Sequence, residues 1–259
     1  MTRSSVVLSL LGGLGAGIGV GYVAASRLVA KKVAQKVLTK PRLYIYDHCP
    51  FCVRVRMIFA LKGVDVELVF LANHDEDTPI GLVGSKVVPI LETPDGVVMP
   101  ESMDIVRYVD AHYGGAPILA EADPTREDLK KWIHDSADVM RRLYHPRFQA
   151  GYFAEFAQST SRAYYKAKKE KSIGSFEVAI ANSPAYIDAL NGYLLDLEGL
   201  LKTPQSVNGT LSYDDIDLFG RLRGLTIVKG VVWPARVRAY IDHLSTATDV
   251  PLLDSIARF

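Results

Sequence analysis

The feature that most constrains this chain is its pair of cysteines, Cys49 and Cys52, because they are the only two among 259 residues. Two cysteines in so long a chain do not make a disulfide framework, so the fold must rest on hydrophobic cores. The two are separated by only two residues and stand next to a strand–helix pattern. Such a C-x-x-C pair is typical of a redox or a metal motif.

The sequence around the pair predicts an α/β unit over residues 42–114. A short β-prone run, Leu43 to Tyr46, comes before the motif, and a helix with apolar residues four apart follows it. Further strand and helix patterns continue this to the order β-α-β-α-β-β-α, which is a thioredoxin-like arrangement. Gly114 to Pro117 ends the unit with turn-forming residues.

The remainder, residues 125–259, reads as a second, all-helical domain. One amphipathic face carries Leu129, Ile133, Ser136, Met140 and Leu143. Ser183 is the predicted cap of a later helix with Pro184 at its first position, and Ser212 with Asp215 forms a capping-box pair. The predicted fold is therefore α/β followed by all-α.

Residues 1–41 are unlike the rest, because the first 42 residues hold seven basic side chains and no acidic one. An uncharged, glycine-rich apolar run over residues 6–25 is just long enough to cross a bilayer as a helix. We expect a membrane anchor, and the basic residues after it predict a catalytic domain that faces the cytoplasm. A cleaved export or organelle-targeting segment and a disordered tail of a soluble cytoplasmic protein are the alternatives.

Residues 43–259 have a formal charge of −6, which argues against nucleic acid as the main partner. A cluster of basic residues between Arg162 and Lys171 interrupts this acidic body. We expect it to be the solvated face of a helix, with contact to an anionic membrane as the alternative.

Cys49 is the predicted nucleophile, because Pro50 favours a helix that begins directly after it. A sulfur at a helix N-terminus is close to free N–H groups and to the positive end of the helix dipole, which together favour the thiolate. Cys52 lies about one turn further on the same helix face, so it is within reach of the first sulfur. Cys52 or an outside thiol would then resolve a mixed disulfide on Cys49.

Two other interpretations of the pair remain open. The cysteines could be buried structural residues, or they could form half of a zinc site that His48 or a second chain completes. We expect neither, because a proline lies between the cysteines and no further cysteine exists. His48 is expected to be a loop residue.

Two later dipeptides are candidates for the substrate site. Pro89 follows Val88 within a predicted strand, where proline is uncommon, although the sequence alone cannot decide whether this bond is cis. Glu101 and Ser102 open a helix, whose free N–H groups would bind a carboxylate, or Ser102 is only its cap.

These motifs, in this order, resemble the glutaredoxin 2 family, which are bacterial glutaredoxins with a glutathione-transferase-like fold. The resemblance covers the chain from about Arg42 onward and is carried by Tyr44 to Cys52, Arg56 to Phe59, Val88 to Leu91, Met99 to Val106, Leu225-Thr226 and Trp233-Pro234. The apolar segment is not part of it. Phe51 stands where the family often has tyrosine.

The resemblance implies a glutathione-dependent thiol–disulfide oxidoreductase with glutathione as co-substrate. We expect no metal, and we expect the protein to be a monomer. It implies Cys49 as nucleophile and Cys52 as resolving thiol. It also implies a cis bond between Val88 and Pro89 against the glutathione backbone, with Glu101 and Ser102 at the γ-glutamyl end. A transferase or isomerase of the glutathione-transferase superfamily, such as the membrane-associated prostaglandin-synthase type, and a membrane-tethered binding module are the alternatives.

Overall fold

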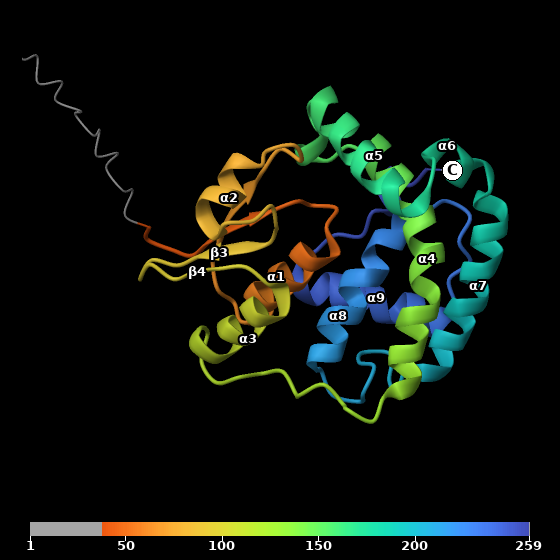
Figure 1. Cartoon of the computed structure of the whole chain (residues 1–259). Coiled ribbons are helices and arrows are strands. Elements are labelled where there is room, and N and C mark those ends of the chain that lie inside the picture. Colours follow the sequence, from red (N-terminus) through yellow and green to blue (C-terminus); the bar gives the residue numbers. More distant parts are fainter. Residues whose placement is uncertain (1–37, 259) are drawn as a thin grey trace, which may run out of the picture. The chain divides into compact units, whose positions relative to one another are not determined.

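The computed structural model describes residues 38–258, which begin with an α/β part. It consists of β1 (Arg42–Ile45), α1 (Pro50–Leu61), β2 (Glu67–Phe70), α2 (Asp77–Val83), β3 (Ile90–Glu92), β4 (Val98–Met99) and α3 (Ser102–His112). The predicted order β-α-β-α-β-β-α is confirmed. Figure 1 shows α1 and α3 on one side of the sheet and α2 on the other.

The sheet has the strand order β2-β1-β3-β4. β1 is parallel to β2, with Leu43 opposite Leu68, and antiparallel to β3, with Leu43 opposite Leu91. β3 starts at Ile90, so Val88 and Pro89 precede the strand in which they were predicted to lie, because Pro89 has no N–H group to give to a sheet ladder. Ile90 and Leu91, at the start of β3, are fully buried between the helix layers.

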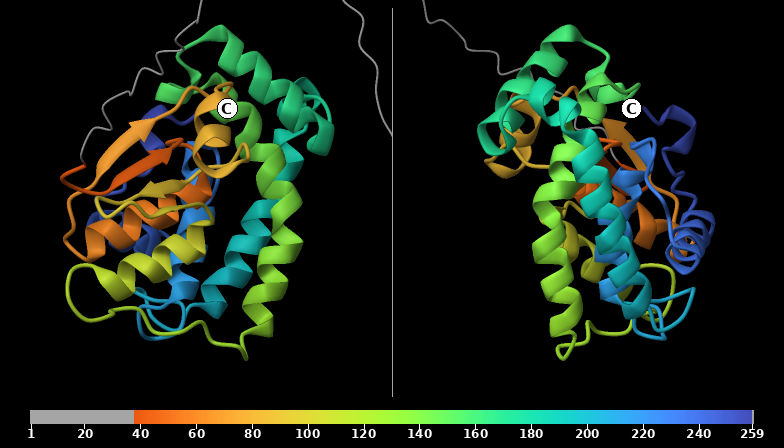
Figure 2. Two further views of the ribbon diagram at one scale, coloured as in Figure 1. Left: turned by 60° about the vertical axis from the view of Figure 1, so that its left-hand side comes forward. Right: turned by 90° about the vertical axis from the view of Figure 1, so that its right-hand side faces the viewer.

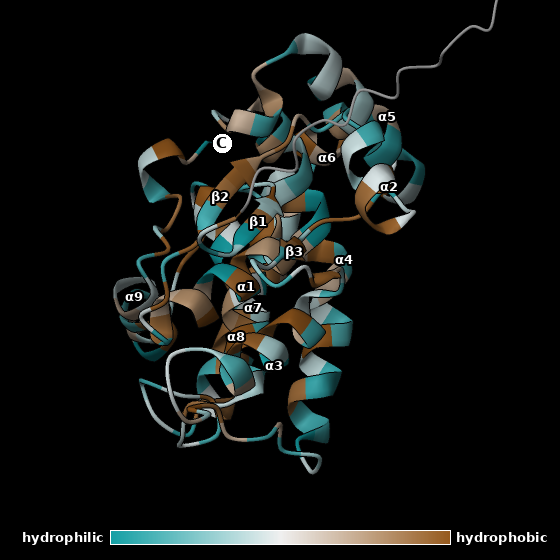
Figure 3. Cartoon of the chain, turned by 90° about the vertical axis from the view of Figure 1, so that its left-hand side faces the viewer, coloured by the Kyte–Doolittle hydropathy of each residue, from teal (hydrophilic) through white to brown (hydrophobic). Residues whose placement is uncertain are grey.

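The second part is helical, as predicted. Its elements are α4 (Glu127–Ala150), η1 (Ala154–Phe156), α5 (Ser159–Ile173), α6 (Phe176–Ala181), α7 (Ser183–Leu200), α8 (Tyr213–Arg223), η2 (Gly224–Ile227), α9 (Ala235–Thr248) and η3 (Asp254–Ile256). The long helices α4 and α7 lie side by side (Figures 1 and 2). Figure 3 shows hydrophobic and hydrophilic residues alternating along α4, as a helix with one buried face requires.

The helix caps predicted from the sequence are those of α7 and α8. The capping box of Ser212 and Asp215 at α8 is confirmed, since each side chain satisfies a backbone N–H of the other residue. The predicted cap of α7 is wrong by one residue: Asn182 is the cap and Ser183 is already helical. The Ser183 hydroxyl instead accepts a hydrogen bond from Arg147 of α4 at 3.0 Å, so it serves helix packing.

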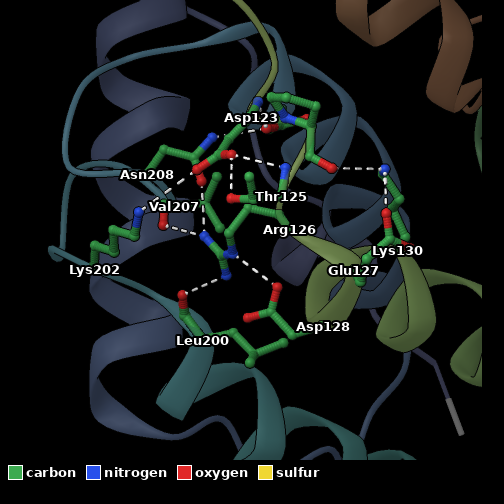
Figure 4. Close-up of polar contacts among 12 residues, drawn as sticks. Asp123, Thr125, Arg126, Glu127, Asp128, Lys130, Leu200, Lys202, Val207 and Asn208 are labelled. Atoms are coloured by element: carbon green, nitrogen blue, oxygen red, sulfur yellow. Dashed lines mark hydrogen bonds and ion pairs between the residues drawn. The ribbon is translucent and has the colours of Figure 1, made fainter.

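Arg126 fixes the start of α4 to the loop that follows α7 (Figure 4). Its guanidinium donates to the carbonyl oxygen of Leu200 at 2.9 Å, to that of Val207 at 2.9 Å and to Oδ1 of Asn208 at 2.7 Å. Its Nε donates to Asp128 at 2.9 Å. A buried arginine with all these acceptors holds the connection from the α/β part in one geometry.

The predicted fold needs one correction. Among residues 38–258, no helix is long and apolar enough to cross a membrane, so the predicted transmembrane helix is not part of the structure described. The segment 6–25, on which that prediction was made, lies outside the described residues. The predicted domain bounds, residues 42–114 and 125–259, stay a prediction. The buried apolar side chains of the two parts form one continuous cluster, so the core does not mark a boundary between them.

Candidate active site

Cys49 stands at the N-cap of α1, as the sequence predicts. Its backbone is extended, with φ −76° and ψ 121°, and its carbonyl oxygen accepts the first helical hydrogen bond, from Val53 at 3.0 Å. Pro50 occupies the first turn, where no N–H donor is lost. The Cys49 sulfur is thus placed where the helix N–H groups are free.

Cys49 is not open to the outer surface, since the residue is only 7% exposed. It lines a cavity of about 630 Å³, whose other wall comes from the helical part, including Met140, Tyr144 and Phe148 of α4. These side chains line the cavity opposite Cys49, and their presence there could not be predicted from the motif. Cys49 therefore faces a partly apolar cavity instead of the outer surface.

The two sulfurs differ in acidity. A hydrogen bond from the Cys52 thiol, together with the charge of His48 and the N–H groups of Cys52 and Phe51, lowers the pKa of Cys49 to about 6 against the opposing effect of burial. Burial raises the pKa of Cys52, which is fully buried and accepts a hydrogen bond from the Tyr46 N–H at 3.4 Å. Both cysteines are free thiols. At neutral pH, Cys49 is the thiolate and Cys52 the protonated partner.

The other predicted site residues lie around the same cavity. Val88, Pro89, Glu101 and Ser102 all line it together with Cys49. The Val88–Pro89 peptide bond is cis, the form that the family resemblance implied. Glu101 has φ +72°, a conformation that residues other than glycine rarely adopt and that tends to cluster at functional sites.

Ser102 is held by a long-range contact. Arg54 of α1 donates from Nη1 to the Ser102 hydroxyl oxygen at 3.0 Å and forms an ion pair with Asp217 of α8. This arginine is buried. Its two contacts link α1 to α3, which Ser102 begins, and to α8 of the helical part. Since the hydroxyl oxygen accepts from Arg54, its own proton is free to be donated into the cavity.

Sequence reasoning missed the contact of His48 with Glu155, a fully buried carboxylate of η1. Oε1 of Glu155 accepts the backbone N–H of His48 at 3.0 Å and lies 2.6 Å from its Nδ1. Burial raises the pKa of Glu155, but the contacts with His48 outweigh it and hold this pKa below its usual value. His48 is a loop residue, as predicted, but a buried one with an ionised partner.

A second missed contact fixes the residue before His48. Arg223 of α8 is 1% exposed and donates to both the carbonyl oxygen of Asp47, at 2.5 Å, and its carboxylate, at 3.0 Å. Arg56 of α1 donates to the same carboxylate at 2.6 Å. The turn before Cys49 is therefore bound by Arg223 of the helical part, which is distant in sequence, as well as by Arg56 of α1.

The basic cluster of α5 is not simply a solvated face. Lys168 and Lys169 line the cavity together with Arg141 of α4. Lys168 is exposed, as expected of a solvated face, whereas Lys169 is half-buried. Tyr144 and His145 line it as well. Within residues 38–258, no group of three or more histidine, cysteine or acidic side chains could hold a metal ion.

Comparison with known proteins places this site in a family. The family described as "Glutaredoxin 2, C terminal domain" matches residues 128–257, and "Glutathione S-transferase, N-terminal domain" matches residues 48–112. Glutaredoxin 2 of Escherichia coli (strain K12) is 44% identical over 216 residues, which cover 83% of this chain and 99% of that protein.

A solved structure agrees with these matches. Glutaredoxin 2 of Salmonella typhimurium in complex with glutathione superimposes with a TM-score of 0.80 at 44% identity, covering 84% of this chain and 99% of that one. A glutathione S-transferase of Ceriporiopsis subvermispora, 14% identical, matches with a TM-score of 0.61 over 82% of this chain and 97% of that one, which indicates a shared fold. The chain belongs to the glutaredoxin 2 family.

Proposed function

We propose that this protein is a glutathione-dependent thiol–disulfide oxidoreductase that reduces protein disulfides or glutathione mixed disulfides through Cys49 and Cys52. The observation that carries the proposal is a sulfur with a lowered pKa at the start of α1, facing a cavity large enough for a tripeptide. Membership of the glutaredoxin 2 family supports it, as does the glutathione bound to the Salmonella typhimurium relative.

The first step is an attack of the Cys49 thiolate on the glutathione sulfur of a mixed disulfide. A sulfur–sulfur bond forms between Cys49 and glutathione, the bond to the substrate sulfur breaks, and the substrate leaves as a thiolate that takes up a proton. The thiolate of a second glutathione then attacks the mixed disulfide, which frees Cys49 and yields oxidised glutathione. The low pKa of Cys49 also makes it a good leaving group in this step.

With a protein disulfide, the same attack leaves one substrate sulfur bound to Cys49. Cys52 then loses its proton and attacks the Cys49 sulfur, so that the substrate leaves as a dithiol and the pair becomes a disulfide. Two glutathione molecules reduce that disulfide and restore the enzyme. The raised pKa of Cys52 keeps it protonated until the first sulfur has reacted.

We propose that glutathione binds along the α/β wall of the cavity. The backbone of Val88, next to Pro89, would pair with the cysteinyl part of the tripeptide, because no strand covers it there. Ser102 would bind the γ-glutamyl carboxylate through its hydroxyl and the free N–H groups of α3, and Glu101 would bind the ammonium group. We also propose that the enzyme works as a monomer in a reducing compartment.

The test is reduction of a glutathionylated peptide by the wild type and by single-cysteine variants. Cys49→Ser should abolish turnover, and Cys52→Ser should keep it for glutathione mixed disulfides while losing it for protein disulfides. An active Cys49→Ser protein would refute the proposal. Conjugation or isomerisation without disulfide turnover would favour the transferase alternative instead.

A further inference from the structure

One wall of the cavity carries three cations that face the reactive cysteine from the helical part. We call Arg141 of α4 and Lys168 and Lys169 of α5 the cationic wall. Burial lowers the pKa of Lys169, and the nearby charges of Lys168 and Arg141 lower it further, whereas the Cys49 thiolate opposes this. The three cations therefore act on one another, and at least one of them acts on the nucleophile.

Within the part of the chain that the structure describes, none of these three cations forms an ion pair. The lysine ammonium groups lie over aromatic rings, Lys168 5.9 Å from the centre of Tyr164 and Lys169 5.5 Å from that of Tyr165.

Neighbouring cations on the same two helices behave differently. Lys166 pairs with Glu177 at 2.5 Å, and Arg142 pairs with Asp138 at 2.7 Å. Among residues 38–258, these two cations are thus held by carboxylates of their own surroundings, whereas the three cations of the cationic wall are not.

The charged side chains that line the cavity are mostly cationic, whereas the chain beyond residue 42 carries a net negative charge. Beyond residue 42 the formal charge is −6, yet six cationic and only two anionic side chains line the cavity. The two acidic ones, Glu101 and Asp104, stand on the α/β wall, where we place the ammonium group of glutathione. The cationic wall lies on the helical side, so it is open to the other half of a mixed disulfide.

We propose that the cationic wall binds carboxylates of the substrate half of a mixed disulfide, so that the preferred substrates are glutathionylated cysteines in acidic peptide segments. This rests on the proposed function and names the substrate class of the same site. Lys169, which is half-buried, gains most from an incoming carboxylate, because partial desolvation strengthens the attraction. Arg141 and Lys168 are exposed and add to the positive charge around it. The aromatic rings below the lysines hold their ammonium groups in place.

The experiment compares two glutathionylated peptides that differ only in the residues around the cysteine, one with four glutamates and one with four glutamines. The wild type should show a kcat/KM about tenfold higher for the acidic peptide at low salt. Raising the salt from about 0.01 M to about 1 M should remove most of the difference, because the screening length falls from about 30 Å to about 3 Å.

Variants identify the residues responsible. Lys168→Gln with Lys169→Gln should lower the preference for the acidic peptide to about threefold or less, and Lys168→Glu with Lys169→Glu should reverse it. Lys171→Gln is the matched control, because this exposed lysine of α5 does not line the cavity and its loss should leave the preference unchanged. Turnover of the glutamine peptide shows that each variant is folded and active.

The outcomes separate this inference from the proposed function. Equal kcat/KM for both peptides in the wild type, or an unchanged preference in both double variants, would overturn the acidic-substrate proposal while leaving the oxidoreductase intact. A raised KM for glutathione with an unchanged peptide preference would overturn it too, because the wall would then bind carboxylates of glutathione. Failure to reduce either peptide would overturn the proposed function itself.

Discussion

One carboxylate oxygen of Glu155 binds both the backbone N–H and the imidazole of His48, with Oε1 lying 3.0 Å from the backbone nitrogen and 2.6 Å from Nδ1. The two residues are separated by 107 positions in the sequence, and His48 comes directly before Cys49. The carbonyl oxygen of Glu155 also accepts the N–H of Asn73 at 2.9 Å. A short segment of the helical part therefore holds two loops at the carboxyl ends of β1 and β2.

Removing this carboxylate should destabilise the protein. Glu155→Ala leaves two buried donors of His48 without an acceptor, which we expect to lower the free energy of unfolding by about 1–3 kcal/mol. Glu155→Gln keeps one oxygen acceptor at the same place and should cost less. Urea unfolding of both variants measures this, and equal losses would show that the hydrogen bonds of Oε1 do not matter.

The same carboxylate should make stability depend on pH in the acid range. Because the pKa of Glu155 is lower in the folded protein than its usual value, its contribution is fully present above the unfolded pKa of about 4.3 and is lost as the pH falls through the lower folded pKa. The difference in unfolding free energy between the wild type and Glu155→Gln should therefore shrink below about pH 4. A difference that stays constant down to pH 2 would contradict this.

The acidity of Cys49 should depend on the hydrogen bond from Cys52. The rate of alkylation by iodoacetamide should rise with pH and level off above a pKa of about 6. Cys52→Ala removes the donor and should raise the pKa of Cys49, whereas Cys52→Ser still has a hydroxyl group to donate and should raise it less. Identical titration curves for the two variants would argue against the hydrogen bond as the main cause.

Gly220 of α8 is needed for the close approach of α8 to the start of α1. A Cβ atom at this position would lie 2.8 Å from the carbonyl oxygen of Pro50 and 3.1 Å from Cγ of Arg54. We expect Gly220→Ala to destabilise the protein by about 1–3 kcal/mol and to lower activity, since it displaces the first turn after Cys49.

Gly192 of α7 is the matched control for this prediction. A Cβ atom there meets nothing within 4 Å, and the residue is an exposed helical glycine. Gly192→Ala should therefore stabilise the protein by about 0.5–1 kcal/mol. Thermal unfolding and peptide reduction measure both variants, and equal behaviour of the two would show that α8 does not restrain the active-site turn.

The local parts of the site were predictable from the sequence. The position of Cys49 at the helix cap follows from Pro50 and from the apolar spacing after it, because both act within one turn of helix. The presence of Val88 and Glu101 around the same cavity was predictable from the family resemblance. Patterns of this kind depend on neighbours in the sequence or on motifs that recur in order.

The contacts between the two parts were not predictable. Nothing near His48 points to Glu155, and nothing near Asp47 points to Arg223, which is 176 residues away. Lys168 and Lys169 belong to a basic run that looks like a solvated helix face, and only the packing of α5 against the cavity distinguishes them from Lys171. Such pairings depend on how the helices pack, which a single sequence does not encode in any local pattern.

The hydrogen bonds from Arg223 to Asp47 limit how the two halves of such a protein can be recombined. The thioredoxin-like half does not carry all the groups that shape its own reactive turn, so it is not an interchangeable module. Joining it to the helical half of another protein would leave the Asp47 carbonyl oxygen without its donor, Arg223, and the His48 amide without its acceptor, Glu155. A working chimera would have to bring along the arginine of α8 and the glutamate of η1 as transplanted parts of the same active site.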